Sequence, residues 1–373
     1  IYGTTPHSFN VDAHNYSIDL TLSGDLTVYD GGAISGDQKG YRHDLGPGAG
    51  EGYFTGASAG SRPGSGGGYG GVAGDSYYDR VVAFEGGLYY GSTTVPTDIG
   101  SGGGSTGYGY GGSGGGSIVL MVVGTTTIDG VVSAQGGDGL AVYAPTGGGS
   151  GGSIYLTTGT LAGAGSVHAN GGAGQDGNND SGAGAGGRIA LYYSSGTNSA
   201  LTMTAYGGAA TDAEHGAAGT IYLFDSGSVY GDLLVDNNDL VTKTYTVATN
   251  TAAHMLFDTI TLRNNGTLVV PEDNELTYTD LAWTDDGILT ERGTINLPSN
   301  FTVPAGATYV ADRARSFGNL TIYGTTTHSW NYDSPVYGLD LTMTGDLTIA
   351  AGGVVNVSGR GYAGSYGPGT GSY

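Results

Sequence analysis

The chain has 373 residues, of which 77 are Gly and 28 are Tyr, and it contains no Cys. Its 33 acidic and 11 basic residues give a net charge of −22, which repels phosphate backbones and excludes nucleic-acid binding through a basic face. No apolar run approaches the roughly 20 residues that a membrane-spanning helix needs, so no membrane span is expected. Without Cys, neither disulfides nor thiol chemistry is available to this sequence.

The composition predicts an all-β fold. Lys occurs twice, Glu six times and Gln three times, whereas Thr, Val, Tyr and Gly are abundant. Few residues therefore favour helices and many favour strands. Collagen is excluded because Pro is scarce and Gly does not recur at every third position.

The first segment, residues 1–45, predicts short strands whose inward positions include Leu26, Val28 and Ile34. The same sequence returns 321 residues later, because 1–52 align without a gap on 322–373 with 25 of 52 positions identical. The corresponding inward positions there are Leu347, Ile349 and Val355. We interpret the chain as a window on a longer tandem array; the alternative is one protein with two related ends.

Residues 46–117 form a Gly/Tyr-rich excursion, with 27 Gly between positions 46 and 116. One interpretation is a flexible loop, and the other is an ordered Gly/Tyr cover that packs on the remaining strands or on a neighbouring copy. The Tyr content favours the second interpretation, because many aromatic rings in a mobile loop would expose a sticky surface.

Residues 118–239 contain a shorter repeat, in which an Ile-x-Leu tripeptide follows each Gly-rich stretch. The four tripeptides begin at Ile118, Ile154, Ile189 and Ile221, at spacings of 36, 35 and 32 residues. Each unit offers short alternating strands too small to bury an apolar face alone, so the units are expected to stack.

In residues 240–321 the Gly-rich excursions disappear and the strand-like segments come closer together, separated by turns such as Asn264-Asn265-Gly266. Residues 322–373 begin the next 321-residue repeat. Together these patterns predict a parallel β-helix, or β-solenoid, with long Gly/Tyr-rich excursions. Separate β-sandwich domains are the main alternative, but sandwiches do not show a period near 34 residues.

Two strings, Gly149–Leu156 and Gly184–Tyr193, resemble the Gly-rich tandem repeats of very large bacterial surface proteins. The later segment Asp346–Val357 resembles coils of filamentous-haemagglutinin-like and pectate-lyase-like β-helices. This resemblance implies a parallel β-helix in a giant adhesin or a related surface protein.

Parallel β-helices also include polysaccharide lyases and hydrolases, which carry characteristic catalytic motifs. Of the hydrolase motifs only the Asp285-Asp286 pair occurs, and it lies in a turn-like context. Gly-x-Ser-x-Gly occurs around four serines, as expected in Gly-rich sequence, without the strand-to-helix context of a nucleophile elbow. The serines are Ser58, Ser105, Ser113 and Ser150. We expect no enzyme activity and no catalytic residue.

Calcium is the one metal that the sequence suggests. Asp176, Asn178 and Asp180 place oxygen ligands at alternate positions, as the first half of an EF-hand loop does. The Gly comes one position late and the closing Glu is missing, so solvated acidic turns are the alternative interpretation. No other cofactor is expected.

The favoured function is that of a structural subunit of an extracellular or cell-surface fibre, sheath or stalk that self-associates into a homopolymer. The alternative is an adhesin that binds surface glycans through its Tyr-rich loops. A polysaccharide lyase or hydrolase is a third, weaker hypothesis, because the hydrolase motifs are incomplete and a strongly acidic chain would repel the acidic sugar on which a lyase acts.

Overall fold

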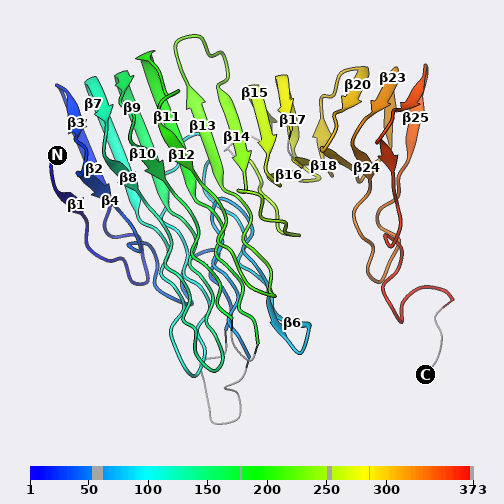
Figure 1. Ribbon diagram of the computed structural model, residues 1–373, viewed down its shortest axis with the longest axis horizontal. Helices are drawn as coiled ribbons and strands as arrows, with labels where there is room; N and C mark the ends of the chain where they lie inside the picture. The colour runs from blue at the N-terminus through cyan, green and yellow to red at the C-terminus, as the bar shows by residue number, and fades with distance from the viewer. Residues whose placement is uncertain (53–61, 177–178, 250–253, 285, 370–373) are drawn as a thin grey trace.

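The computed structural model describes residues 1–52, 62–176, 179–249, 254–284 and 286–369. In this part of the chain all regular structure is β-strand, which confirms the predicted all-β class. The strands stack broadly in chain order along the long axis, and the two ends of the chain lie at opposite ends of the stack (Figure 1).

Most strands pair in parallel within a few separate sheets. The largest sheet contains β19 (Thr294–Ile295), β17 (Glu275–Trp283), β15 (His254–Arg263), β14 (Asp232–Asp236), β13 (Thr220–Phe224), β11 (Arg188–Gly196), β9 (Ser153–Ala162), β7 (Ser117–Ile128), β2 (Ile18–Leu22) and β3 (Leu26–Val28). A second sheet contains β1 (Thr4–Pro6), β4 (Ala33–Ser35), β8 (Val131–Ser133), β10 (Ser166–His168) and β12 (Thr202–Thr204). A third contains β16 (Thr267–Val270), β18 (Ile288–Glu291), β21 (Thr308–Ala311), β24 (Thr325–Thr327) and β27 (Val354–Val355).

Three small sheets complete the described structure. They are β20 (Asn300–Val303), β23 (Asn319–Ile322) and β26 (Leu347–Ile349); β22 (Arg315–Phe317) and β25 (Leu341–Met343); and the antiparallel pair β5 (Ser76–Tyr78) and β6 (Val81–Phe84).

The four Ile-x-Leu tripeptides lie on neighbouring strands in matching register. Ile118 pairs with Ile154, Ile154 with Ile189, and Ile189 with Ile221, all in parallel. All four Ile side chains are buried. The near-constant spacing therefore brings like residues together, so that each apolar side chain packs on the same residue type one strand away.

Within the largest sheet, the described strands β13 and β14 depart from the parallel pattern and form an antiparallel hairpin. Gly231 in its turn has a φ of 80°, a conformation that suits Gly. Asp258 from β15 holds this turn: one carboxylate oxygen accepts hydrogen bonds from the backbone N–H groups of Val229, Tyr230 and Gly231 at 2.7 to 2.9 Å.

The Gly-rich segments extend from one side of the strand stack (Figure 1) and pack into a bundle held by backbone hydrogen bonds. In the central segment, 147–152, backbone N–H groups three residues apart donate hydrogen bonds to the same neighbouring segment. Three residues per turn is the period of a polyproline II helix. The acceptors are Gly104 and Ser101, Gly182 and Ala185, and Gly137 and Ala134. It also accepts hydrogen bonds from Gly67, Gly112, Gly115 and Gly172. Six neighbouring segments thus surround this one.

Glycine is required in the bundle because the backbones are too close for side chains. A Cβ atom built on Gly147 would lie 1.8 Å from the carbonyl oxygen of Ser65. The Gly-rich stretches among the described residues of the 46–117 excursion belong to this bundle, in which Tyr69 is fully buried, and Ser76–Phe84 form the β5–β6 hairpin. They form an ordered cover, as the Tyr content of the excursion favours.

The inward positions differ between the two related ends. Leu26 and Val28 are 6% and 0% exposed, as predicted, but their counterparts Leu347 and Ile349 are 44% and 51% exposed. Val355 is also exposed, whereas its counterpart Ile34 is buried. The prediction that all six face a core is therefore wrong for the second set. The reason is that among the described residues β26 and β27 pair only with the earlier strands β23 and β24, so no later strand covers them, whereas β3 and β4 are followed by the pairing strands β7 and β8.

Candidate functional site

A groove of about 680 Å³ opens over the outer face of β16, β18 and β21. This part of the chain, residues 254–321, lacks the Gly-rich excursions that cover the earlier strands, so the sheet face is left accessible. Thr290 and Val310 lie on its floor, and the connection before β15 and the loops of the last repeat form its walls. The groove therefore results from the alternation of covered and uncovered parts along the stack.

Three cationic and three aromatic residues line this groove, which we call the cationic groove: Lys243, Arg292, Arg360, Tyr245, Trp330 and Tyr337. The chain as a whole has only 11 Lys and Arg, so this is a local concentration of positive charge on an acidic protein. The Trp330 side chain is 52% exposed and offers an apolar ring at the groove surface.

Arg292 is fixed between two tyrosines. Its guanidinium carbon lies 5.5 Å from the centre of the Tyr245 ring and 5.6 Å from that of Tyr337, both within cation–π range. Its Nε donates to the buried carboxylate of Asp312 at 3.2 Å. Burial acts to lower the pKa of Arg292, but the neighbouring Tyr337 and Asp312 outweigh it and raise that pKa, so the group is charged.

Asp312 in turn is held by Ser329, whose backbone N–H and hydroxyl both donate to its carboxylate at 2.6 Å. Ser329 directly precedes Trp330, so this contact also positions the loop that carries the exposed ring. The β21 end, the Arg292 side chain and the Trp330 loop are thus linked through one carboxylate.

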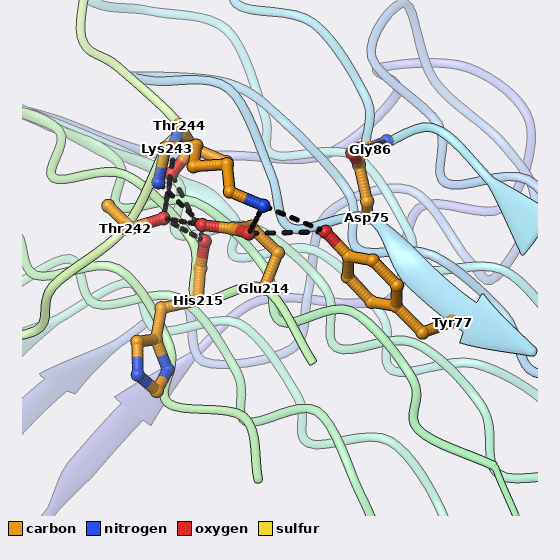
Figure 2. A network of polar contacts seen from close by, with 8 residues as sticks. All are labelled: Asp75, Tyr77, Gly86, Glu214, His215, Thr242, Lys243 and Thr244. Carbon is orange, nitrogen blue, oxygen red and sulfur yellow. Dashed lines mark hydrogen bonds and ion pairs between the residues drawn. The ribbon is translucent and has the colours of Figure 1, made fainter. Parts of the chain in front are cut away.

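Lys243 lies at the other side of the groove, in the network that Figure 2 shows around Glu214. Its Nζ is 3.6 Å from a Glu214 carboxylate oxygen and 3.4 Å from the Tyr77 hydroxyl. The hydroxyls of Thr242 and Tyr77 donate to the same carboxylate at 2.9 and 3.4 Å. Burial acts to lower the pKa of Lys243, but Tyr77 and Glu214 raise it overall. The network anchors one groove wall to the Gly/Tyr-rich cover.

The arrangement suits binding rather than proton transfer. Two carboxylates that pair with groove cations, Glu214 and Asp312, are largely buried and already accept several hydrogen bonds. An exposed aromatic ring beside fixed cations is suited to a ligand with an apolar ring face and a negative or polar substituent.

The predicted calcium ligands are only partly described, because Asn178 lies outside the described residues. Burial and the nearby carboxylates of Asp176 and Asp212 raise the pKa of Asp180. Within the described ranges, no group of three or more His, Asp or Glu side chains is arranged to hold a metal ion. The calcium site stays a prediction.

The motifs considered for catalysis are dispersed. Ser58 and Asp285 lie outside the described residues, and Asp286 is an exposed turn residue with a φ of 58°. Ser105 and Ser150 are buried in the Gly-rich bundle, where their hydroxyls bond to backbone groups. The part of the chain that the structure describes includes no helix able to cross a bilayer.

Sequence reasoning did not identify the cationic groove. Its cations come from three separate segments, and no local motif marks them. The available signal was the scarcity of basic residues, which makes each one notable. No family model, curated protein or solved structure matches the chain.

Proposed function

We propose that this chain is part of a β-solenoid that builds an extracellular or cell-surface fibre, sheath or stalk from tandem 321-residue repeats, as its resemblance to Gly-rich surface proteins implies. In this proposal the parallel strands form the coils of the solenoid, the Gly-rich bundle stiffens one side of it, and the function is mechanical. Self-association extends the fibre along the strand-stacking direction.

One observation carries the proposal: two asparagines 321 positions apart make the same contacts. The Asn10 side-chain amide donates to the carbonyl oxygens of Tyr16 and Lys39, both at 2.8 Å. The Asn331 amide donates to those of Tyr337 and Arg360, at 2.8 and 3.0 Å. Tyr337 and Arg360 are the residues 321 positions after Tyr16 and Lys39.

The strands around these asparagines repeat as well. Thr4 pairs with Ala33 in β1 and β4, and Thr325 pairs with Val354 in β24 and β27, again at an offset of 321. The second set lies at the far end of the stack (Figure 1). A unit that recurs in the same local structure further along the stacking direction is what a growing solenoid needs.

The test is the shape of longer arrays. Chains with two, three and four 321-residue periods should form rods whose length, measured by small-angle X-ray scattering or negative-stain microscopy, grows by about 50 Å per period at constant width. Images of native material should show fibres with the same axial repeat. Compact particles that widen with each added period would refute the proposal.

The cationic groove supports a second candidate function, binding of acidic carbohydrate at the cell surface. Aromatic rings pack against the apolar faces of sugars, and the fixed Arg292 would pair with a carboxylate or sulfate group. This is a different surface from the Tyr-rich loops that the sequence suggests for an adhesin.

A glycan array with neutral and acidic oligosaccharides tests this second function. We expect acidic ligands to bind, and Trp330→Ala to weaken binding at least tenfold. Tyr323→Ala removes an aromatic ring of similar exposure that does not line the groove, so it should leave binding unchanged. An array without binding by the wild-type chain would favour the purely mechanical function.

A further inference from the structure

We propose that the edge formed by β25, β26 and β27 binds a further copy of the segment Ser117–Ser133, in the register in which this chain already seats that segment on β2, β3 and β4. This inference rests on the proposed tandem fibre and specifies how one repeat joins the next.

The edge is an apolar surface with one open side. β25, β26 and β27 each pair with only one described strand, whereas β4 lies between β1 and β8. Leu347, Ile349, Val354, Val355 and Val357 are all at least 40% exposed. An open strand edge with a row of exposed apolar side chains is a template for pairing with another strand.

The first repeat shows how this segment pairs with the strands that correspond to the edge. In the first repeat, Leu26 and Val28 pair with Thr126 and Ile128 of β7, and Ile34 pairs with Val132 of β8. Leu26 and Leu347 are the same residue type, and Gly24-Asp25-Leu26-Thr27 is identical to Gly345-Asp346-Leu347-Thr348. The edge thus offers the same backbone pattern to an incoming strand.

Two further contacts in the first repeat have counterparts at the edge. Asp25 accepts a hydrogen bond from the backbone N–H of Thr125 at 2.7 Å, and Asp346 occupies the equivalent position. The carbonyl oxygen of Gly32 accepts from the N–H of Val131 at 3.0 Å, and Gly353 is its counterpart. The incoming segment would therefore find its side-chain and backbone partners in place.

Hydrogen exchange on an extended chain tests the inference. Residues 53–133 are appended after Tyr373, which continues the repeat in its own order, and amide exchange over 341–357 is compared with that of the 373-residue chain. We expect exchange in 347–349 and 354–357 to slow at least tenfold. Unchanged exchange in a chain whose added residues are folded would overturn the inference.

Substitutions on the edge provide the controls. Leu347→Asp and Val355→Asp alter side chains that are 44% and 40% exposed in the 373-residue chain, so that chain should still fold, but the protection in the extended chain should be lost. Thr348→Asp adds the same charge on the opposite face of β26 and should keep the protection. Protection that survives Leu347→Asp would also refute this register.

Rods that form without protection of the edge would contradict this inference alone, whereas absence of rods would contradict the fibre.

Discussion

The guanidinium of Arg188 lies 5.6 Å from the centre of the Tyr69 ring, and both side chains are fully buried. Arg188 belongs to β11 and Tyr69 to the Gly/Tyr-rich cover. The guanidinium also donates to the Tyr90 carbonyl oxygen and to the Thr93, Thr220 and Thr249 hydroxyls at 2.8 to 3.2 Å. One buried cation thus joins the strand stack to its cover, and burial lowers its pKa.

We expect Arg188→Met to lower the free energy of unfolding by about 3 kcal/mol, because the buried oxygens that accept from the guanidinium lose their donor. Arg188→Lys keeps the charge but not the planar fork, so it should restore little of the loss. Urea denaturation measures both, and Arg313→Met, at an exposed position, is the control. Equal stability of Arg188→Met and the control would show that the cover does not depend on this contact.

The close packing of the Gly-rich bundle predicts that Gly→Ala substitutions inside it destabilise the fold much more than the same substitution elsewhere. Gly147→Ala places a methyl group against the Ser65 carbonyl oxygen, so the surrounding segments must move apart at a cost of about 3 kcal/mol. Gly24→Ala is the matched control, because nothing lies within 4 Å of a Cβ at that position. Thermal unfolding of the two variants should differ clearly, and similar midpoints would contradict close packing of the bundle.

The stacking of Ile118, Ile154 and Ile189 follows from the sequence, because a short amphipathic strand needs an equivalent neighbour and the spacing identifies it. The arrangement of the bundle around 147–152 cannot be predicted in this way, since glycines have no side chains that would indicate which segments are neighbours. The antiparallel β13–β14 hairpin is also hidden, because its turn depends on Asp258 from a later strand.

The cationic groove is hidden for a related reason. Lys243, Arg292 and Arg360 approach one another only because the parallel strands align their segments. To predict the open sheet face, one would also have to know where the Gly-rich cover ends. Leu347 is a case in which the sequence predicts too much burial. The alternation of apolar and polar residues predicts that it is buried, but burial also requires a neighbouring strand that covers it.

The predicted calcium loop can be tested through Asp180. Because its pKa in the folded state is raised, ionisation of this group costs stability as the pH rises through that pKa. In the presence of EDTA, Asp180→Asn should therefore stabilise the fold slightly at pH 7, by less than about 1 kcal/mol since the group is partly exposed, and the gain should vanish in acid.

Calcium should reverse this order if the loop binds it through Asp176, Asn178 and Asp180. The wild-type midpoint of thermal unfolding should then rise with added calcium, and that of Asp180→Asn should not. Identical midpoints of the wild type with calcium and with EDTA would exclude the predicted site.

Asp258 gives the opposite pH dependence. Burial acts to raise its pKa, but the N–H groups of Val229, Tyr230 and Gly231 outweigh that effect and lower it overall. A lowered folded-state pKa means that this carboxylate stabilises the fold above the unfolded value of about 3.9, and that the stabilisation is lost as the pH falls through the folded value.

Asp258→Asn should therefore cost about 1 kcal/mol at pH 7 and nothing at the acid end of the range. Asp280→Asn, at an exposed position on β17, should change stability little at any pH. Urea denaturation between pH 2 and 7 distinguishes the two, and a cost for Asp258→Asn that stays constant across the series would mean that the amide loses packing in the turn rather than charge-assisted hydrogen bonds.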